Sequence, residues 1–173
     1  MLILVSGGAS SGKSAFAEEL IVRSGLKERI YLATMQVWDK ESERRVERHR
    51  AMRAGKGFAT LERPLDLAGL PLPPGSAVLL EDLTNLTANE YFGPQGPKGA
   101  LERLTAGLRQ ATASPALLVA VTGELFSDGI AYDPETAQYL TCLAQLNRAA
   151  AAQAEQVFEV VCGIPIPWKG AQP

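Results

Sequence analysis

The sequence has 173 residues, a formal net charge of −2, and 46% hydrophobic against 21% charged residues. These values predict one globular domain over residues 1–173, and they exclude a general electrostatic attraction to nucleic acid or to an anionic membrane. No apolar run approaches the roughly 18 residues needed to span a bilayer, so we expect no membrane span and a cytoplasmic protein.

A glycine-rich loop follows the first predicted strand, Leu2–Ser6. Gly7–Ser14 fits the Walker A pattern GxxxxGK[ST], and good helix formers follow at Ala15–Leu20. This strand-loop-helix context argues against a glycine-rich turn that binds nothing. Backbone N–H groups and the helix N-terminus are therefore expected to bind the phosphates of a nucleoside triphosphate, either ATP or GTP.

Each residue of this loop is a candidate nucleotide contact. Lys13 is predicted to reach the β- and γ-phosphates, and the hydroxyl of Ser14 to be a ligand of Mg²⁺ that bridges them. The loop residues expected to contact nucleotide are Gly7, Gly8, Ala9, Ser10, Ser11, Gly12, Lys13 and Ser14.

Further apolar strands alternate with helical patterns, which predicts a single-domain α/β fold with a doubly wound, mostly parallel sheet of the P-loop NTPase type. Helical spacing of leucine is clear at 101–111 and after Pro134. Surface loops are expected at 71–75 and 93–99, and the tail from Gly163 is expected to run over the surface. The expected strands are Leu2–Ser6, Arg29–Ala33, Ala77–Glu81, Pro115–Thr122 and Gln156–Cys162, with Phe58–Leu61 as a candidate for one more.

Polar residues at the strand ends are the next candidates, because ligands of a doubly wound sheet gather at the carboxyl ends of its strands. The strand Ala77–Glu81 is apolar until it ends in acid, as a Walker B element does, so Glu81 is a candidate Mg²⁺ ligand. The alternative is that Glu81 and Asp82 are solvated loop acids. The ends at Ala33-Thr34 and Thr122–Glu124 are candidates for lining the nucleotide or acceptor site.

Residues 38–56 form a highly charged segment with helical spacing, and it contains His49, the one histidine of the sequence. Arg45 and Arg53 stand one helical turn to either side of His49. Two guanidinium groups could bind phosphate and keep the imidazole neutral and nucleophilic. The alternative is a solvated helix face held by pairs of Glu and Arg.

The two cysteines carry no chemistry that the sequence indicates. Cys142 and Cys162 have no Cys or His nearby at metal-ligand spacing, and two thiols do not make a disulfide scaffold. Both are interpreted as packing residues.

Taken in order, these segments resemble the bifunctional adenosylcobinamide kinase and adenosylcobinamide-phosphate guanylyltransferase family of cobalamin biosynthesis, over nearly the whole chain. After the Walker loop, no short match is decisive alone, but the ordered set is fairly specific. The matching runs are Ile3–Ser14, Tyr31–Thr34, Arg45–Arg50, Thr60–Glu62, Leu79–Glu81 and Val157–Gly163.

The resemblance implies two reactions and several site residues. His49 would attack the α-phosphorus of GTP and hold GMP as a phosphoramidate, and the phosphate of adenosylcobinamide phosphate would then take the GMP. The corrinoid substrate and a homo-oligomer, a trimer, are also implied. The residues that the resemblance adds as nucleotide contacts are Ala33, Thr34, Arg50, Arg53, Glu62 and Glu81.

Three features depart from the family pattern. Arg48 stands where the family often has a second histidine, and Ser10 replaces a common arginine. Ala137, Leu140 and Thr141 stand where the family typically has arginines and an aspartate, so the corrinoid-facing surface is expected to differ. The alternative functions are a small-molecule kinase without transferase activity and a nucleotide-dependent switch module, since a Walker loop does not fix the acceptor.

Overall fold

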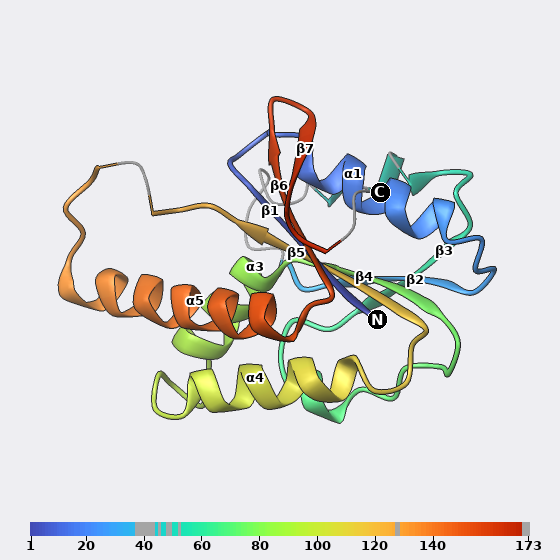
Figure 1. Cartoon of the computed structure of the whole chain (residues 1–173). Helices are drawn as coiled ribbons and strands as arrows, with labels where there is room; N and C mark the ends of the chain where they lie inside the picture. Colours follow the sequence, from blue (N-terminus) through green and yellow to red (C-terminus); the bar gives the residue numbers. More distant parts are fainter. Residues whose placement is uncertain (37–43, 45, 48–49, 52, 127–128, 171–173) are drawn as a thin grey trace.

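A computed structural model describes residues 1–36, 44, 46–47, 50–51, 53–126 and 129–170. Within these residues seven strands form one sheet in the order β3-β2-β4-β5-β1-β6-β7, parallel except for the antiparallel pair β6–β7 (Figure 1). The strands are β1 (Leu2–Gly7), β2 (Arg29–Ala33), β3 (Phe58–Glu62), β4 (Ala77–Glu81), β5 (Leu117–Gly123), β6 (Gln156–Val161) and β7 (Ile164–Lys169).

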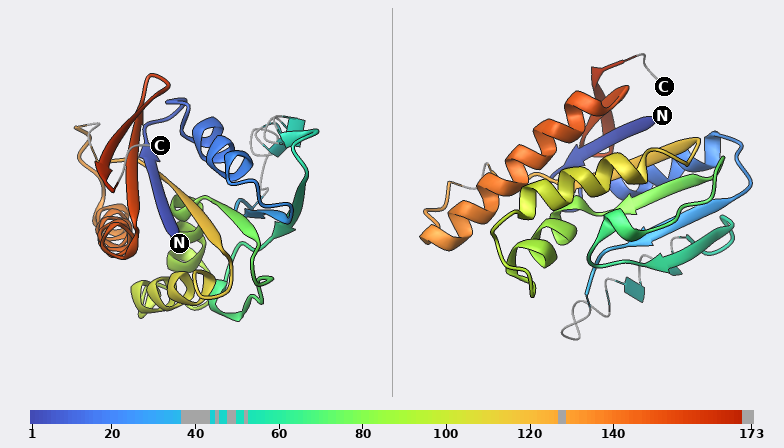
Figure 2. Two further views of the ribbon diagram at one scale, coloured as in Figure 1. Left: turned by 45° about the vertical axis from the view of Figure 1, so that its right-hand side comes forward. Right: turned by 90° about the horizontal axis from the view of Figure 1, so that it is seen from below.

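Helices cover both faces of the sheet, which confirms the doubly wound prediction (Figure 2). Alternate residues of β1 show the two faces: Ile3 and Val5 pack into the apolar cluster beneath α1, while Leu2 and Leu4 pack into the cluster of the other helices. Because β4 and β5 are covered on both sides, their residues read as continuous apolar runs. The helices are α1 (Lys13–Arg23), α3 (Leu83–Phe92), α4 (Ala100–Ala111), α5 (Pro134–Gln153) and the short 3₁₀ helix η1 (Leu67–Gly69).

The expected strands are all present, and the candidate strand at Phe58–Leu61 is real: it is β3, the parallel edge strand beside β2. The tail from Gly163 runs over the surface as expected, with Ile164 65% and Trp168 69% exposed. Its strand was not predicted: residues from Ile164, with Pro165 and Pro167 among them, form β7 and pair with β6. Prolines are tolerated here because β7 is the outer strand of the sheet.

Helical structure differs from the sequence expectation in two places. Helix α3 was not predicted; the side chain of Asp82 begins it by accepting a hydrogen bond of 2.7 Å from the N–H of Asn85. In the charged segment, residues 44, 46–47, 50–51 and 53 are helical, but 54–57 form a turn rather than continuing the helix to Lys56. His49, Arg45 and Arg48 lie outside the described residues.

The cysteines also separate into two cases. Cys142 of α5 is buried and packs in the core, as expected. Cys162 was expected to pack as well, but it is exposed in the turn between β6 and β7, where its φ of 51° gives the chain the left-handed conformation of a tight turn.

Candidate functional site

The loop Gly7–Ser14 joins β1 to α1 at the carboxyl edge of the sheet. Gly12 is the N-cap of α1 with φ of 94°, and a Cβ there would lie 3.2 Å from Cα of Gly163, so both conformation and space favour glycine. A Cβ on Gly7 would lie 2.7 Å from the carbonyl oxygen of Val160. The loop is thus closely packed against β6 and the turn that follows it.

Lys13 curls back over this loop. Its Nζ donates a hydrogen bond of 3.2 Å to the carbonyl oxygen of Gly8, and the side chain is half-buried. The ammonium group therefore lies over the loop, where the resemblance and the Walker pattern both expect phosphate.

Ser14 connects this loop to the end of β4. Its Oγ donates a hydrogen bond of 2.5 Å to Oε1 of Glu81, which is 8% exposed. Oε2 of Glu81 is buried and has no hydrogen-bond partner among the described residues. Burial raises the pKa of Glu81 to about 7, with a further rise from Asp82, while the Ser14 hydrogen bond and Lys13 oppose it. The alternative interpretation of Glu81 as a solvated loop acid is therefore wrong.

The pair Ser14 and Glu81 has the donor set that Mg²⁺ needs in a nucleotide site. Mg²⁺ takes oxygen ligands, commonly one or two carboxylates with phosphate oxygens and water. The free Oε2 of Glu81 and the adjacent Ser14 hydroxyl supply two such oxygens from the protein. Among the described residues no group of three or more His, Cys, Asp or Glu gathers as a metal site, so the other ligands would be phosphate oxygens or water.

Thr34, at the end of β2, holds the chain that follows β4. Its Oγ1 accepts a hydrogen bond of 2.7 Å from the N–H of Asp82, and it lies 2.9 Å from the carbonyl oxygen of that residue. The side chain is fully buried. Ala33 and Thr34 thus lie beside Glu81, and the Thr34 hydroxyl is hydrogen-bonded to the backbone of Asp82. Thr122, at the end of β5, is similarly engaged, donating 2.9 Å to Oδ1 of Asn147.

A second group of predicted residues meets at the edge of β3. Arg50 is exposed, and its Nη2 lies 3.4 Å from Oε1 of Glu62. A hollow of about 440 Å³ lies beside them. Its lining residues are Arg50, Arg53, Ala54, Gly55, Gly57, Phe58 and Thr60.

Arg53 is buried rather than on a solvated face. Its guanidinium carbon lies 3.2 Å above the ring centre of Tyr31, a β2 residue, and its Nη1 is buried with no partner in the part of the chain that the structure describes. Burial raises the pKa of the Tyr31 hydroxyl above its ordinary value, so the ring beneath Arg53 is neutral. The positive charge of Arg53 at the wall of the hollow favours an anionic ligand there.

Sequence reasoning missed the residues that hold this second group. Lys56 donates from Nζ to Oε2 of Glu18 at 2.5 Å, and its carbonyl oxygen accepts 2.8 Å from Nη1 of Arg29. Glu18 is 1% exposed, because it shares the buried face of α1 with Ile21. The available signal was the spacing: Glu18 stands three residues before the apolar Ile21, so on a helix the two share one face, and a carboxylate on a buried face needs a cation as its partner.

The departures from the family pattern at Ala137, Leu140 and Thr141 lie in the first half of α5, whereas Ser10 lies in the phosphate loop. Ala137 and Thr141 are exposed and Leu140 is half-buried. No helix within the described residues is long and apolar enough to cross a membrane.

Comparison with known proteins places the sequence of this chain in a family. The family model for cobinamide kinase / cobinamide phosphate guanyltransferase matches residues 3–168. The Escherichia coli (strain K12) bifunctional adenosylcobalamin biosynthesis protein CobU is 36% identical over 98% of this chain and 100% of its own. The corresponding CobP of Pseudomonas aeruginosa is 34% identical over 96% of both chains. CobU of Salmonella typhimurium is 35% identical over 98% of this chain and all of its own.

Among solved structures, a prototypical ATPase from the type III secretion system of pathogenic bacteria is similar, with a TM-score of 0.55 over 91% of this chain and 50% of that chain. At 10% sequence identity this likeness concerns the fold alone.

Proposed function

The chain belongs to the cobinamide kinase / cobinamide phosphate guanyltransferase family, and from this premise we propose that it carries out both reactions on adenosylcobinamide in cobalamin biosynthesis. It phosphorylates adenosylcobinamide with ATP or GTP, and it then transfers GMP from GTP to the phosphate so formed, giving adenosylcobinamide-GDP. The family match carries the choice of acceptor, and the structural observation that supports the phosphoryl-transfer site is the contact of Ser14 with the buried Glu81, which joins the Walker loop to an acidic strand end.

In the kinase step, the hydroxyl of the aminopropanol arm attacks the γ-phosphorus of the triphosphate. A new O–P bond forms, the bond to the bridging oxygen breaks, and the nucleoside diphosphate leaves with that electron pair while the hydroxyl loses its proton. The loop N–H groups and Lys13 hold the phosphates in line and neutralise their charge. Ser14 and Glu81 would hold Mg²⁺, whose contribution is further charge neutralisation on the phosphate oxygens.

In the transferase step, an imidazole nitrogen of His49 attacks the α-phosphorus of GTP, a P–N bond forms and pyrophosphate leaves. A phosphate oxygen of adenosylcobinamide phosphate then attacks the same phosphorus, and the P–N bond breaks. Support comes from Arg50 and Arg53, which follow His49 in the sequence and line the hollow at β3. The guanidinium group of Arg53 stacks on Tyr31 at the wall of that hollow and brings positive charge to it. Arg50 and Glu62 stand together as the remaining proposed nucleotide contacts.

The direct test is covalent labelling by GTP. The unaltered protein, incubated with GTP and Mg²⁺, is expected to gain the mass of one GMP, and His49→Ala is expected to gain none while it keeps much of its kinase activity. Arg44→Ala is the matched control, since Arg44 is an exposed residue of the same charged segment. An adduct of equal intensity in His49→Ala would exclude that histidine. Kinase activity without any adduct on the unaltered protein would favour a kinase alone.

We also propose three finer properties. A cytoplasmic location and Mg²⁺ dependence follow from the sequence patterns described above, and a homo-oligomer, specifically a trimer, follows from the family resemblance. Sedimentation at several protein concentrations tests the oligomer independently of either activity.

A further inference from the structure

Strand β5 ends between the two parts of the proposed phosphoryl-transfer site. It lies between β4, which ends at Glu81, and β1, which leads into the phosphate loop (Figure 1). The N–H of Glu124, the first residue after β5, donates a hydrogen bond of 3.1 Å to the carbonyl oxygen of Gly7. On the other side, Oγ1 of Thr84, in the first turn of α3, accepts 2.8 Å from the N–H of Gly123. The backbone of Glu124 is therefore fixed between the phosphate loop and the chain that follows β4.

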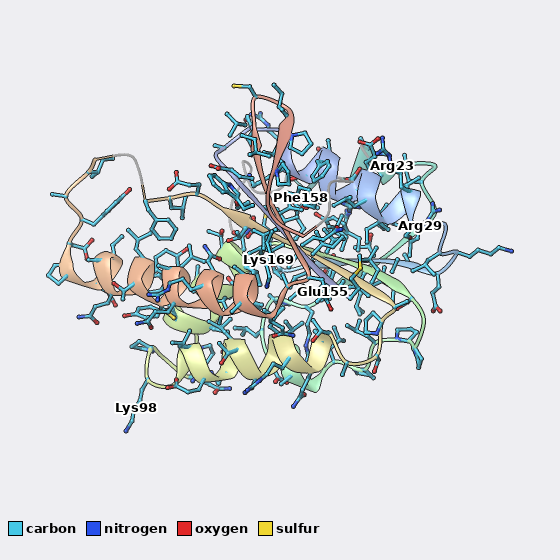
Figure 3. The ribbon with its side chains drawn as sticks, viewed as in Figure 1. Arg23, Arg29, Lys98, Glu155, Phe158 and Lys169 are labelled. Atoms are coloured by element: carbon cyan, nitrogen blue, oxygen red, sulfur yellow. The ribbon has the colours of Figure 1, made fainter. Side chains whose placement is uncertain are left out.

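The phosphate loop beside Glu124 is held in place as well. Phe158 of β6 packs edge-on against Phe16 of α1, with the ring centres 5.2 Å apart (Figure 3). The N–H of Gly163, in the turn after β6, donates a hydrogen bond of 2.8 Å to the carbonyl oxygen of Ser11. The sheet therefore sets the position of Glu124 relative to a phosphate bound in the loop.

The carboxylate of Glu124 lies at the open carboxyl edge of the sheet. The residue is half-buried, and its Oε1 accepts a hydrogen bond of 2.8 Å from the N–H of Phe126. Thr122, two residues earlier, bonds to Asn147 of α5. Residues two apart along a strand share a face, so Glu124 lies on the face toward α5 rather than on the face that α1 covers. Leu125 and Phe126 are 37% and 45% exposed, so a substrate can approach this edge.

The kinase step needs a group that takes the proton of the attacking hydroxyl, and a carboxylate can do so. Three carboxylates stand at the described ends of β4 and β5. Glu81 accepts the Ser14 hydrogen bond and is proposed to hold Mg²⁺, while Asp82 accepts from the N–H of Asn85 and begins α3. Glu124 is the third. The proposed nucleotide contacts at the ends of β2 and β3 lie on the other side of β4, which leaves the end of β5 for the acceptor.

We propose that Glu124 accepts the proton of the adenosylcobinamide hydroxyl as that hydroxyl attacks the γ-phosphorus. The inference rests on the proposed kinase step. As the new O–P bond forms, the proton moves to the Glu124 carboxylate and the O–H electron pair stays on the attacking oxygen. The bond to the bridging oxygen breaks, the nucleoside diphosphate leaves with that electron pair, and the carboxylic acid returns its proton to water. The transferase step does not need Glu124, because its attacking phosphate oxygen is already an anion.

The test is Glu124→Gln, which keeps an oxygen to accept from the N–H of Phe126 but cannot take the proton. The single-turnover rate of adenosylcobinamide phosphorylation by ATP is expected to fall at least about a hundredfold. The affinity for Mg-ATP, measured by calorimetric titration, and the rate of GMP-adduct formation are expected to stay within about twofold. Glu124→Asp keeps a carboxylate and should phosphorylate at least about tenfold faster than Glu124→Gln. Glu135→Gln, which changes an exposed carboxylate in the first turn of α5, is the matched control and should phosphorylate at the normal rate.

A smaller fall in the phosphorylation rate of Glu124→Gln would overturn the inference. Equal phosphorylation rates for Glu124→Gln and Glu124→Asp would also overturn it, because the two variants differ in the ability to take a proton. Losses of Mg-ATP affinity and of adduct formation as large as the kinase loss would show that Glu124 only shapes the loop. If the unaltered protein formed the GMP adduct but phosphorylated no adenosylcobinamide, the proposed kinase step itself would fail, and this inference with it.

Discussion

The ammonium group of Lys56 lies 2.5 Å from Oε2 of Glu18, which joins the turn after the charged segment to the helix that begins at the phosphate loop. Glu18 is almost fully buried, whereas the Lys56 side chain is 39% exposed. The two regions proposed to bind nucleotide, the Gly7–Ser14 loop and the hollow at β3, are thereby both attached to helix α1, although they are far apart in sequence.

Removing Lys56 should be costly because it leaves a buried carboxylate unpaired. For Lys56→Met we expect the free energy of unfolding, measured by urea denaturation, to fall by about 3 kcal/mol. Glu18→Gln/Lys56→Met should recover most of that loss, because a neutral amide then replaces the unpaired charge.

The pair Arg23 and Glu19 on the same helix provides the control. Their side chains are 64% and 53% exposed, so Arg23→Met should cost less than about 0.5 kcal/mol. Equal losses for Lys56→Met and Arg23→Met would show that the buried pair has no special role.

Glu81 should make the stability of the nucleotide-free protein depend on pH. Its pKa in the folded protein is about 7, above the ordinary value, so the folded state binds the proton more tightly than the unfolded state. The resulting stabilisation is present below the ordinary pKa and is lost as the pH rises through about 7. Between about pH 5.5 and pH 8 we expect about 2 kcal/mol of lost stability from this group.

Glu81→Gln isolates that contribution, since the amide cannot titrate. Urea denaturation of both proteins, in chelator, at the two pH values gives a difference in which other titrating groups cancel. The free energy of unfolding of Glu81→Gln, relative to that of the unaltered protein, should increase as the pH rises. A difference that is independent of pH would contradict the raised pKa.

Lys13→Ala should remove most of the kinase activity while leaving the fold intact. Lys13 is half-buried, and among the described residues its ammonium group donates one hydrogen bond, to the carbonyl oxygen of Gly8, so little stability depends on it. We expect a fall in kcat of at least about a hundredfold, because the ammonium group neutralises charge in the transition state. Steady-state phosphorylation of adenosylcobinamide measures this, with thermal unfolding as the check on the fold; near-normal turnover would count against the loop assignment.

The sequence was sufficient for those parts of the fold and site that depend on local patterns. Continuous apolar runs such as β4 predicted buried parallel strands, and the spacing from Gly7 to Ser14 predicted the loop that meets Glu81. These features were predictable because burial on both faces, and phosphate binding by a loop, each require particular residue types at adjacent positions of the sequence.

The remaining features depend on contacts between distant segments. β7 was missed because prolines do not identify an edge strand until the sheet order is known. α3 was missed because it is weakly amphipathic, and because its N-cap residue, Asp82, was interpreted only as one of two acids at the end of a Walker B-like strand. The stacking of Arg53 on Tyr31 joins residues on different elements, and helical spacing around His49 instead suggested a solvated face.

That stacking yields the last prediction, which concerns how Arg53 is held. An aromatic ring beneath a guanidinium group attracts it through the ring quadrupole, and the ring of Tyr31 supplies this at 3.2 Å. Tyr31→Phe keeps the ring, whereas Tyr31→Leu keeps an apolar side chain without it. We expect Tyr31→Phe to form the GMP adduct at close to the normal rate and Tyr31→Leu to form it at least about tenfold more slowly, since each lost 1.4 kcal/mol is about tenfold.

The rate of adenosylcobinamide phosphorylation shows whether Tyr31→Leu misplaces Arg53 alone or disturbs the fold as a whole. Arg53 lines the hollow at β3 and stacks on Tyr31, whereas the kinase step depends on the Gly7–Ser14 loop, so the kinase rate of Tyr31→Leu should fall much less than its rate of adduct formation. Equal losses in both reactions would mean that the leucine disturbs the core of β2 as a whole. Equal adduct rates for the two variants would mean that the ring does not position Arg53, because the aromatic face is what distinguishes them.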